Sequence, residues 1–194
     1  MTKLFYYDIR DTLSDYELSY VCAARKRRAE RYMFYADKAR CLAAGYLLGR
    51  CLGLDEERFV KNQFGKPYAP GSGIYFNLSH GGDYVVLAVS EREIGVDIEP
   101  IGDGNNADMF RAFTNDERVW MKSQSGNDVF CRLWTAKESI MKATGKGLSL
   151  PPESFNAVPC GNSAIEADGR RWILESVFFD NHIICTAVER QANE

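Results

Sequence analysis

The spacing of hydrophobic residues changes once along the chain, and this change most limits the fold. Residues 14–54 place hydrophobic side chains at intervals of three and four, which predicts helix. The repeating positions are Leu42, Tyr46, Leu47, Cys51 and Leu52. After the glycine- and proline-rich loop "GKPYAPGSG", three segments predict consecutive strands: "IYFNLS", "YVVLAVS" and "EREIGVDIE". Helices followed by adjacent strands indicate an α+β fold.

Short polar and glycine signals predict where these elements begin and end. Ser14 with Glu17 three residues later predicts a capped helix start, and Gly53 predicts a helix end. Two further helices are expected in "DMFRAFTNDERVWMKSQ" and "NDVFCRLWTAKESIMKATG", the second ending at Gly145. The rest of the chain predicts strands, with turns at residues 168–169 and 180–181.

A weak internal echo suggests two similar α+β halves. "GK" at 65–66 is followed by "FN" at 76–77, and "GK" at 145–146 is followed by "FN" at 155–156. In both places a predicted helix comes before and a predicted strand comes after. The two halves are therefore expected to meet near Pro100.

The composition argues against several classes of protein. The 194 residues carry a formal net charge of −3, so an extended nucleic-acid surface is not expected. The first residues lack the pattern of a signal peptide, and no hydrophobic run approaches the roughly 18 residues of a membrane helix. The six cysteines form no C-x-x-C pair, which argues against zinc. A soluble, cytoplasmic protein without a membrane partner is expected.

The segment "GVDIE" places two carboxylates in a stretch that otherwise predicts a buried strand. Asp97 and Glu99 are two residues apart, so they face the same side and repel each other unless a cation lies between them. Glu138 and Lys142 are four residues apart on a predicted helix and share one face. Each pair alone also fits a plain solvent-exposed surface. Together, the three carboxylates and the lysine favour a Mg²⁺ site that faces phosphate.

Two other segments offer groups for binding an anion. In "FNLSHGG", Ser79, His80 and the backbone N–H groups of the glycines suit an anion, although a structural turn fits equally. Adjacent residues of an extended chain point to opposite sides, which argues against a Ser–His nucleophile pair. The basic stretch "RKRRAERYMFYADKARC" fits a solvated helix face, or one phosphate held by one or two arginines.

These motifs stand in an order that closely resembles the two-halved, Sfp-type 4′-phosphopantetheinyl transferases. The matching segments are "FGKP" (64–67), "FNLSH" (76–80), "GVDIE" (95–99), "FTNDE" (113–117) and "WTAKESIMKATGKGL" (134–148). The resemblance implies an α+β fold of two halves related by a pseudo-twofold. Residues 1–99 would form the half on the adenine and 3′-phosphate side, and residues 100–194 the half on the metal and pyrophosphate side. The site would lie at their interface.

The resemblance also implies a reaction and its catalytic groups. Such enzymes transfer the 4′-phosphopantetheine arm of coenzyme A to a serine of an apo acyl or peptidyl carrier protein, releasing adenosine 3′,5′-bisphosphate. By motif, Asp97, Glu99 and Glu138 correspond to the Mg²⁺ ligands. Lys142 corresponds to the lysine that contacts the pyrophosphate, so Asp97, Glu138 and Lys142 are the implied catalytic residues.

Further residues are implied to bind coenzyme A. Ser79 and His80 correspond to coenzyme contacts, with His80 towards the 3′-phosphate, and Lys66 to the lysine near the adenine. Arg40 corresponds to the arginine that binds the 3′-phosphate, and Arg27 falls loosely on another basic position. A second basic position of the family falls on Ala24, so the resemblance implies that the 3′-phosphate is held by fewer basic groups or by Arg25 or Arg28 instead.

Two other functions stay open. A different Mg²⁺-dependent phosphate enzyme would turn over coenzyme A without a carrier protein. A catalytically idle binding module would tolerate the loss of Glu138. Because both halves lie in one chain, a monomer is expected.

Overall fold

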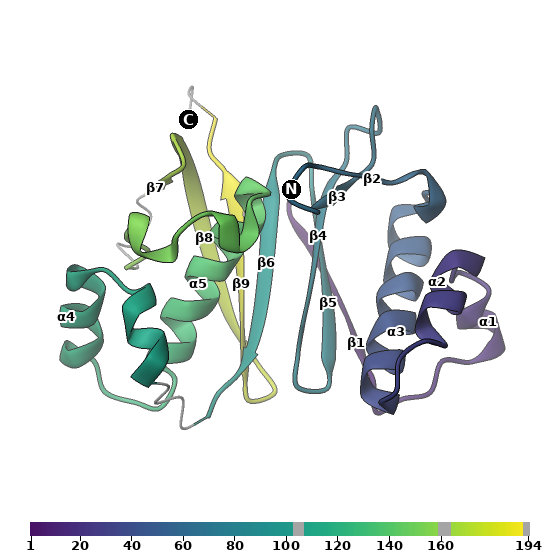
Figure 1. The fold of residues 1–194 in the computed structure, drawn as a ribbon, viewed down its shortest axis with the longest axis horizontal. Helices are drawn as coiled ribbons and strands as arrows, with labels where there is room; N and C mark the ends of the chain where they lie inside the picture. The colour runs from purple at the N-terminus through teal and green to yellow at the C-terminus, as the bar shows by residue number, and fades with distance from the viewer. Residues whose placement is uncertain (103–106, 159–163, 192–194) are drawn as a thin grey trace.

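The computed structural model describes residues 1–102, 107–158 and 164–191. Its first part holds the helices and strands up to residue 90 (Figure 1). They are β1 (Lys3–Asp8), α1 (Asp15–Leu18), α2 (Ala23–Ala29), α3 (Tyr35–Leu52), η1 (Glu56–Arg58), β2 (Val60–Lys61), β3 (Pro67–Tyr68), β4 (Tyr75–Gly81) and β5 (Tyr84–Ser90).

The second part begins with β6 and ends with a long β-hairpin. Its elements are β6 (Ile94–Pro100), η2 (Ala107–Ala112), α4 (Asn115–Ser123), α5 (Val129–Thr144), η3 (Gly147–Ser149), η4 (Pro152–Ser154), β7 (Ile165–Ala167), β8 (Arg170–Phe179) and β9 (His182–Glu189). The chain therefore mixes helix and sheet, as expected. No helix within the described ranges combines the length and the hydrophobicity needed to cross a membrane.

Each part has an antiparallel sheet with one long helix packed against it (Figure 1). The first sheet has the order β1-β5-β4 and is covered by α3, and the second has the order β6-β9-β8-β7 and is covered by α5. Leu48 of α3 and Leu87 of β5 belong to one buried cluster, and Ile140 of α5 and Trp172 of β8 belong to another. Burial of these side chains supplies most of the stabilisation of each layer.

The two sheets meet where β4 lies beside β6 (Figure 1). Asn77 Oδ1 of β4 accepts a hydrogen bond from the Val96 N–H of β6 at 2.9 Å. At Gly81 of β4, a Cβ atom would lie 2.3 Å from the Ile98 carbonyl oxygen, so only glycine allows this approach. The predicted boundary at residues 99 and 100 falls inside β6, whose backbone pairs with β9.

The predicted element ends are largely confirmed. Ser14 and Glu17 form a capping box, and Gly53 ends α3 in the left-handed conformation with φ of 62°. Gly145 ends α5 in the same way with φ of 76°. Both predicted turns are present, and Asp168, Asp180 and Asn181 have positive φ, as tight hairpin turns require.

Three predictions need correction. The helical stretch 14–54 is divided into α1, α2 and α3, because Cys22 and Phe34 are extended and start new helices. The predicted helix at 108–124 is split into η2 and α4, because Thr114 forms a capping box with Glu117 and starts α4. The second "FN", at 155–156, follows η4 and lies in no strand, so the echo does not extend to it.

Candidate active site

The carboxylates of the candidate site come from β6 and α5. Asp97 and Glu99 lie two residues apart on β6, and Glu138 and Lys142 lie one turn apart on α5. Asp97 is 2% exposed, whereas Glu99, Glu138 and Lys142 are partly exposed. Gly95 of β6 lets α5 pack closely, since a Cβ atom there would lie 2.0 Å from the backbone oxygen of Ser139. Close packing of α5 on β6 thus brings the two predicted pairs together.

Lys142 pairs with two of the three carboxylates in this structure, Asp97 and Glu138. Its Nζ lies 2.6 Å from Asp97 Oδ1 and 3.2 Å from Glu138 Oε2. It also donates to Ser79 Oγ at 2.9 Å, and Ser79 Oγ donates to Asp97 Oδ1 at 2.8 Å. Ser79 of β4 is thus tied to groups of β6 and α5. The four side chains form one polar cluster across the junction of the two sheets.

Burial and mutual repulsion raise the pKa values of two carboxyl groups. Burial, followed by the charges of Asp97 and Glu138, raises the pKa of Glu99 to about 7. Burial and Asp97 also raise the pKa of Glu138. Burial alone would lower the pKa of the Lys142 ammonium, but Asp97 and Glu138 outweigh it and raise that pKa. The cluster therefore holds more negative charge than Lys142 neutralises.

We expect the metal-free protein to lose stability as pH rises from about 5 to about 7.5. The pKa of Glu99 is about 7 in the folded protein, above the ordinary value of 4.5 for an exposed glutamate, so Glu99 binds more protons in the folded state in this interval. Unfolding then becomes easier as pH rises. Melting temperatures measured in EDTA across this range test the sign.

The control for this pH effect is a matched pair of substitutions. Glu99→Gln removes one titrating group and should make the loss of stability with pH smaller, whereas Glu166→Gln, on the exposed side of β7, should leave it unchanged. An equal dependence of the melting temperature on pH in wild type and Glu99→Gln would contradict the assignment of this effect to Glu99.

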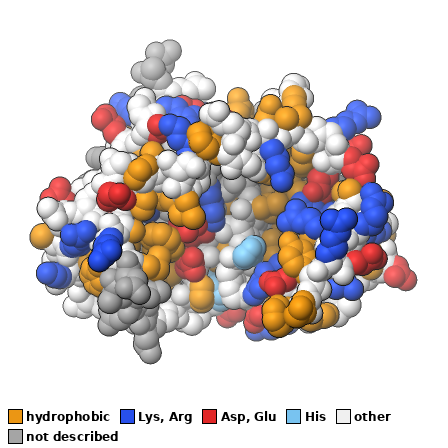
Figure 2. Space-filling model, in the orientation of Figure 1, with side chains coloured by type: hydrophobic (Ala, Val, Ile, Leu, Met, Phe, Trp, Pro, Cys, Tyr) orange, Lys and Arg blue, Asp and Glu red, His pale blue; other side chains and the backbone are white. Residues whose placement is uncertain are grey.

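A cavity of about 640 Å³ opens beside this cluster. Its size is in the range of small-molecule sites. Arg40, His80 and Ser79 all line it, and Ser79 is also part of the polar cluster. On the face of the molecule drawn in Figure 2, histidine lies near the middle, with acidic side chains on one side of it and a group of lysines and arginines on the other. The cavity therefore joins a basic wall to the carboxylates.

Arg40 and His80 contribute to the basic part of the cavity. Arg40 donates to Asp37 Oδ1 at 3.0 Å and to the Gly82 carbonyl oxygen at 2.9 Å, which holds its guanidinium at the end of β4. Burial, with Arg40 and Lys142 nearby, lowers the pKa of His80. An anion bound there would offset this effect and favour the charged imidazole. As predicted for adjacent strand residues, Ser79 is buried and His80 is exposed.

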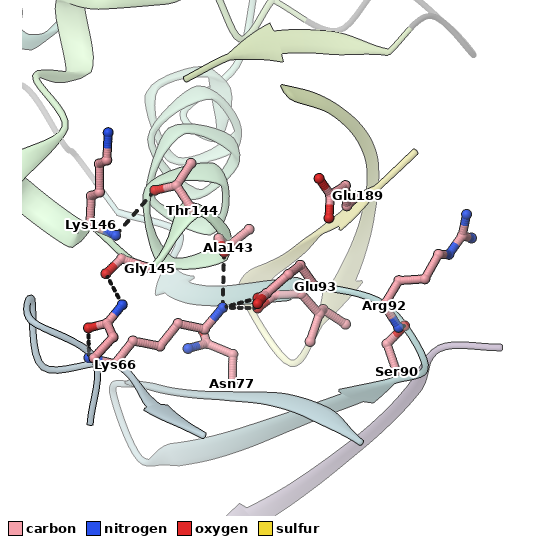
Figure 3. Close-up of polar contacts among 12 residues, drawn as sticks. Lys66, Asn77, Ser90, Arg92, Glu93, Ala143, Thr144, Gly145, Lys146 and Glu189 are labelled. Carbon is pink, nitrogen blue, oxygen red and sulfur yellow. Dashed lines mark hydrogen bonds and ion pairs between the residues drawn. The ribbon is translucent and has the colours of Figure 1, made fainter. Parts of the chain in front are cut away.

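The remaining basic candidates are distributed unevenly. Arg25 and Arg28 line the cavity, whereas Arg27 is exposed and lies outside the described lining. Arg25 Nε lies 2.7 Å from Glu56, an acidic partner that the sequence patterns did not indicate. Lys66 points into the junction between β6 and the end of α5 instead of into this cavity (Figure 3). The structure thus brings Arg40, Ser79 and His80 together and places Lys66 and Arg27 elsewhere.

Carboxylate oxygens are ligands that a hard cation prefers, although these side chains do not converge on one position. Among the described residues, no three acidic, histidine or cysteine side chains are arranged to hold a metal ion. Asp97 Oδ2 is nevertheless buried and has no hydrogen-bond partner within the described chain. A buried carboxylate oxygen without a partner is costly, and a cation would satisfy it.

Comparison with known proteins identifies the family. The sequence model of the 4′-phosphopantetheinyl transferase superfamily (ACPS) matches residues 93–188. The chain is 34% identical over 152 residues to a 4′-phosphopantetheinyl transferase of Bacillus subtilis, covering 73% of this chain and 68% of that protein. The chain belongs to the 4′-phosphopantetheinyl transferase superfamily.

Two other phosphopantetheinyl transferases show how much of the chain is similar to known relatives. The transferase gsp of Aneurinibacillus migulanus is 34% identical over 146 residues, or 71% of this chain and 61% of the relative. The transferase HetI of Nostoc sp. is 31% identical over 198 residues, or 93% of this chain and 80% of the relative. The chain thus spans somewhat less than two thirds of the first relative. The superfamily match from 93 to 188 includes Asp97, Glu99, Glu138 and Lys142.

Proposed function

We propose that this chain transfers the 4′-phosphopantetheine arm of coenzyme A to a serine hydroxyl of an apo acyl or peptidyl carrier protein. The serine oxygen forms a bond to phosphorus, the pyrophosphate bond breaks, and adenosine 3′,5′-bisphosphate leaves. The observation that carries the proposal is the place of Ser79, which lines the basic cavity and bonds to Asp97 and Lys142. Coenzyme A carries a pyrophosphate and a 3′-phosphate, so it would suit a site that runs from the carboxylate cluster into the basic cavity.

Mg²⁺ is part of the same proposal. Asp97, Glu99 and Glu138 would hold it, and the unpartnered Asp97 Oδ2 and the raised pKa of Glu99 support a cation at this place. When bound, Mg²⁺ would neutralise charge on the phosphate oxygens. Mg²⁺ that binds the folded protein would raise its melting temperature, and this shift can be measured without substrate.

The protein side chains would orient the substrates and move one proton. The raised pKa of Glu138 suits a carboxylate that accepts the proton of the serine hydroxyl. Lys142, held by Asp97 and Ser79, would stabilise the charge on the departing phosphate. Arg40 and His80 would hold the 3′-phosphate at the other end of the cavity.

Intact-mass spectrometry of apo carrier proteins tests the proposed function. Each carrier protein is incubated with the enzyme, Mg²⁺ and coenzyme A, and transfer adds the mass of one phosphopantetheine group to one serine. The same mixture without a carrier protein should leave coenzyme A intact. Breakdown of coenzyme A in that control would favour a hydrolase and overturn the proposal.

The two-halved architecture is proposed on the order of the strands. The first strand of each part pairs with the last: β1 with β5, and β6 with β9. In each part the next pairing is the final hairpin: β4 with β5, and β8 with β9. This supports a pseudo-twofold relation in which the second half begins at β6. A chain that carries both halves needs no partner subunit, so light scattering should give the mass of a monomer.

Arg40→Ala is expected to lower the rate with coenzyme A by about ten- to a hundredfold, the value of one charge-assisted hydrogen bond. It should change the rate with dephospho-coenzyme A little, because that substrate lacks the 3′-phosphate. Rates for both substrates at low concentration measure the difference. Arg31→Ala is the matched control, since Arg31 is exposed and outside the described lining of the cavity. Equal slowing with both substrates would assign Arg40 to the fold instead.

A further inference from the structure

The C-terminal end of α5 is held by side chains from other parts of the chain. The last carbonyl groups of a helix have no partner within the helix and need one elsewhere. Here three consecutive carbonyl oxygens accept from three side chains of other elements. The bonds are Lys66 Nζ to Ala143 at 3.0 Å, Arg170 Nη2 to Thr144 at 3.1 Å, and Asn62 Nδ2 to Gly145 at 2.8 Å.

The ammonium group of Lys66 makes three hydrogen bonds beside the end of α5 (Figure 3). It donates to Glu93 Oε2 at 2.8 Å and to the carbonyl oxygens of Ile94 and Ala143, each at 3.0 Å. An ammonium group has three hydrogens, and all three have partners. The side chain is 13% exposed. As folded, Lys66 has no hydrogen left to offer to a ligand.

Asn62 fixes the loop that carries Lys66. Its Oδ1 accepts from the backbone N–H groups of Phe64 at 2.9 Å and Lys66 at 3.0 Å. Its Nδ2 is then free to donate to the Gly145 carbonyl oxygen of α5. One side chain therefore shapes the loop and joins it to the helix.

We propose that Lys66 and Asn62 are positioning residues, which hold the last turn of α5 and thereby set Lys142 against Asp97. Lys142 directly precedes Ala143, whose carbonyl oxygen Lys66 binds. A lysine at the negative end of a helix dipole also stabilises the helix terminus. This inference rests on the proposed function for its effect on transfer, but not for the effect on the helix.

The same loop reaches the cavity. Gly65 and Pro67, on either side of Lys66, line it. A coenzyme bound in the cavity would therefore contact the loop that holds α5. Occupancy of the cavity and the position of Lys142 are coupled through this loop.

Two substitutions test the proposal. Lys66→Met keeps the length of the side chain but removes all three bonds, and Asn62→Asp keeps the acceptor that shapes the loop while replacing the donor to Gly145 with an oxygen that repels its carbonyl group. Both should accelerate amide hydrogen exchange in the last turn of α5 by about tenfold or more. Both should lower kcat by about tenfold while changing the Kd of coenzyme A, measured by calorimetry, less than about threefold.

The matched control is Lys146→Met. Lys146 lies just beyond the same helix end, and within the described chain its ammonium group bonds to Asp168, at 2.6 Å, and not to α5. Removing this charge should leave exchange in α5 and kcat within about twofold of wild type. A change equal to that of Lys66→Met would show that general charge, and not the specific bonds, matters.

The outcomes separate this proposal from the proposed function. If Lys66 instead binds coenzyme A, Lys66→Met should weaken Kd at least about tenfold and leave exchange in α5 unchanged, which would overturn the proposal. Asn62→Asp gives an independent answer if Lys66→Met fails to fold. If wild type transfers nothing, the proposed function fails, while the exchange measurement still decides whether these residues hold α5.

Discussion

Replacing Glu138 by Gln is expected to slow phosphopantetheine transfer by at least about a hundredfold. Gln keeps the shape of the side chain but removes one charge beside Asp97 and Lys142, whose Nζ lies 3.2 Å from Glu138 Oε2. The loss combines a weaker cation site with the loss of a proton acceptor. Initial rates from the mass assay measure the effect, and circular dichroism checks that the fold persists, because Glu138 is only partly buried.

Glu175→Gln is the matched control for this substitution. Glu175 lies on the exposed side of β8, so the same change of charge there should leave the rate within about twofold. Magnesium titrations should show a weaker apparent affinity for Glu138→Gln than for the control. Unchanged transfer by Glu138→Gln would refute the three-carboxylate site.

Gly95→Ala is expected to lower the free energy of unfolding by about 3 kcal/mol, at the upper end of the usual cost of overpacking. The added Cβ atom would lie 2.0 Å from the Ser139 carbonyl oxygen and 2.4 Å from the Ala143 nitrogen. Both are backbone atoms of α5, so a side chain cannot turn away to make room. The helix would have to move from β6, and Lys142 would move with it. Urea unfolding measures the loss.

Gly102→Ala makes the same chemical change in open space. Apart from its chain neighbours, no described residue places an atom within 4 Å of the Cβ position of Gly102, so its unfolding free energy should change by less than about 0.5 kcal/mol. If Gly95→Ala were as stable as this control, α5 and β6 would not be packed as described.

Local patterns were sufficient to predict the two elements of the candidate site. Alternation put Asp97 and Glu99 on one face of β6, and the spacing of four put Glu138 and Lys142 on one face of α5. The grouping of these pairs in one site was predicted, but periodicity could not predict the direct bond from Lys142 to Asp97, because 45 residues separate them and side-chain periods do not show which elements pack together. The positive partner of the strand carboxylate Asp97 is thus a lysine in this structure.

The missed features arise from competing local signals and from distant contacts. "TNDE" at 114–117 has the spacing of a capping box, which divides the expected helix, although the hydrophobic pattern continues across it. Lys137 is fully buried, and its Nζ lies 2.5 Å from Oε1 of the buried Glu117, a pairing that no sequence pattern indicates. Neither the partner of Lys137 nor that of Lys66 lies near it in sequence, so no local period could reveal them.

The contact between Asn77 and Val96 has a consequence for the solubility of the second sheet. β6 is the first strand in the order β6-β9-β8-β7, so its outer backbone groups would be open to pairing with another chain. β4 covers that edge, and the Asn77 side chain accepts from the Val96 N–H. The part of the chain that carries β4 thus protects the second sheet from edge-to-edge aggregation. A fragment beginning at β6 would lack this protection and associate through its exposed edge.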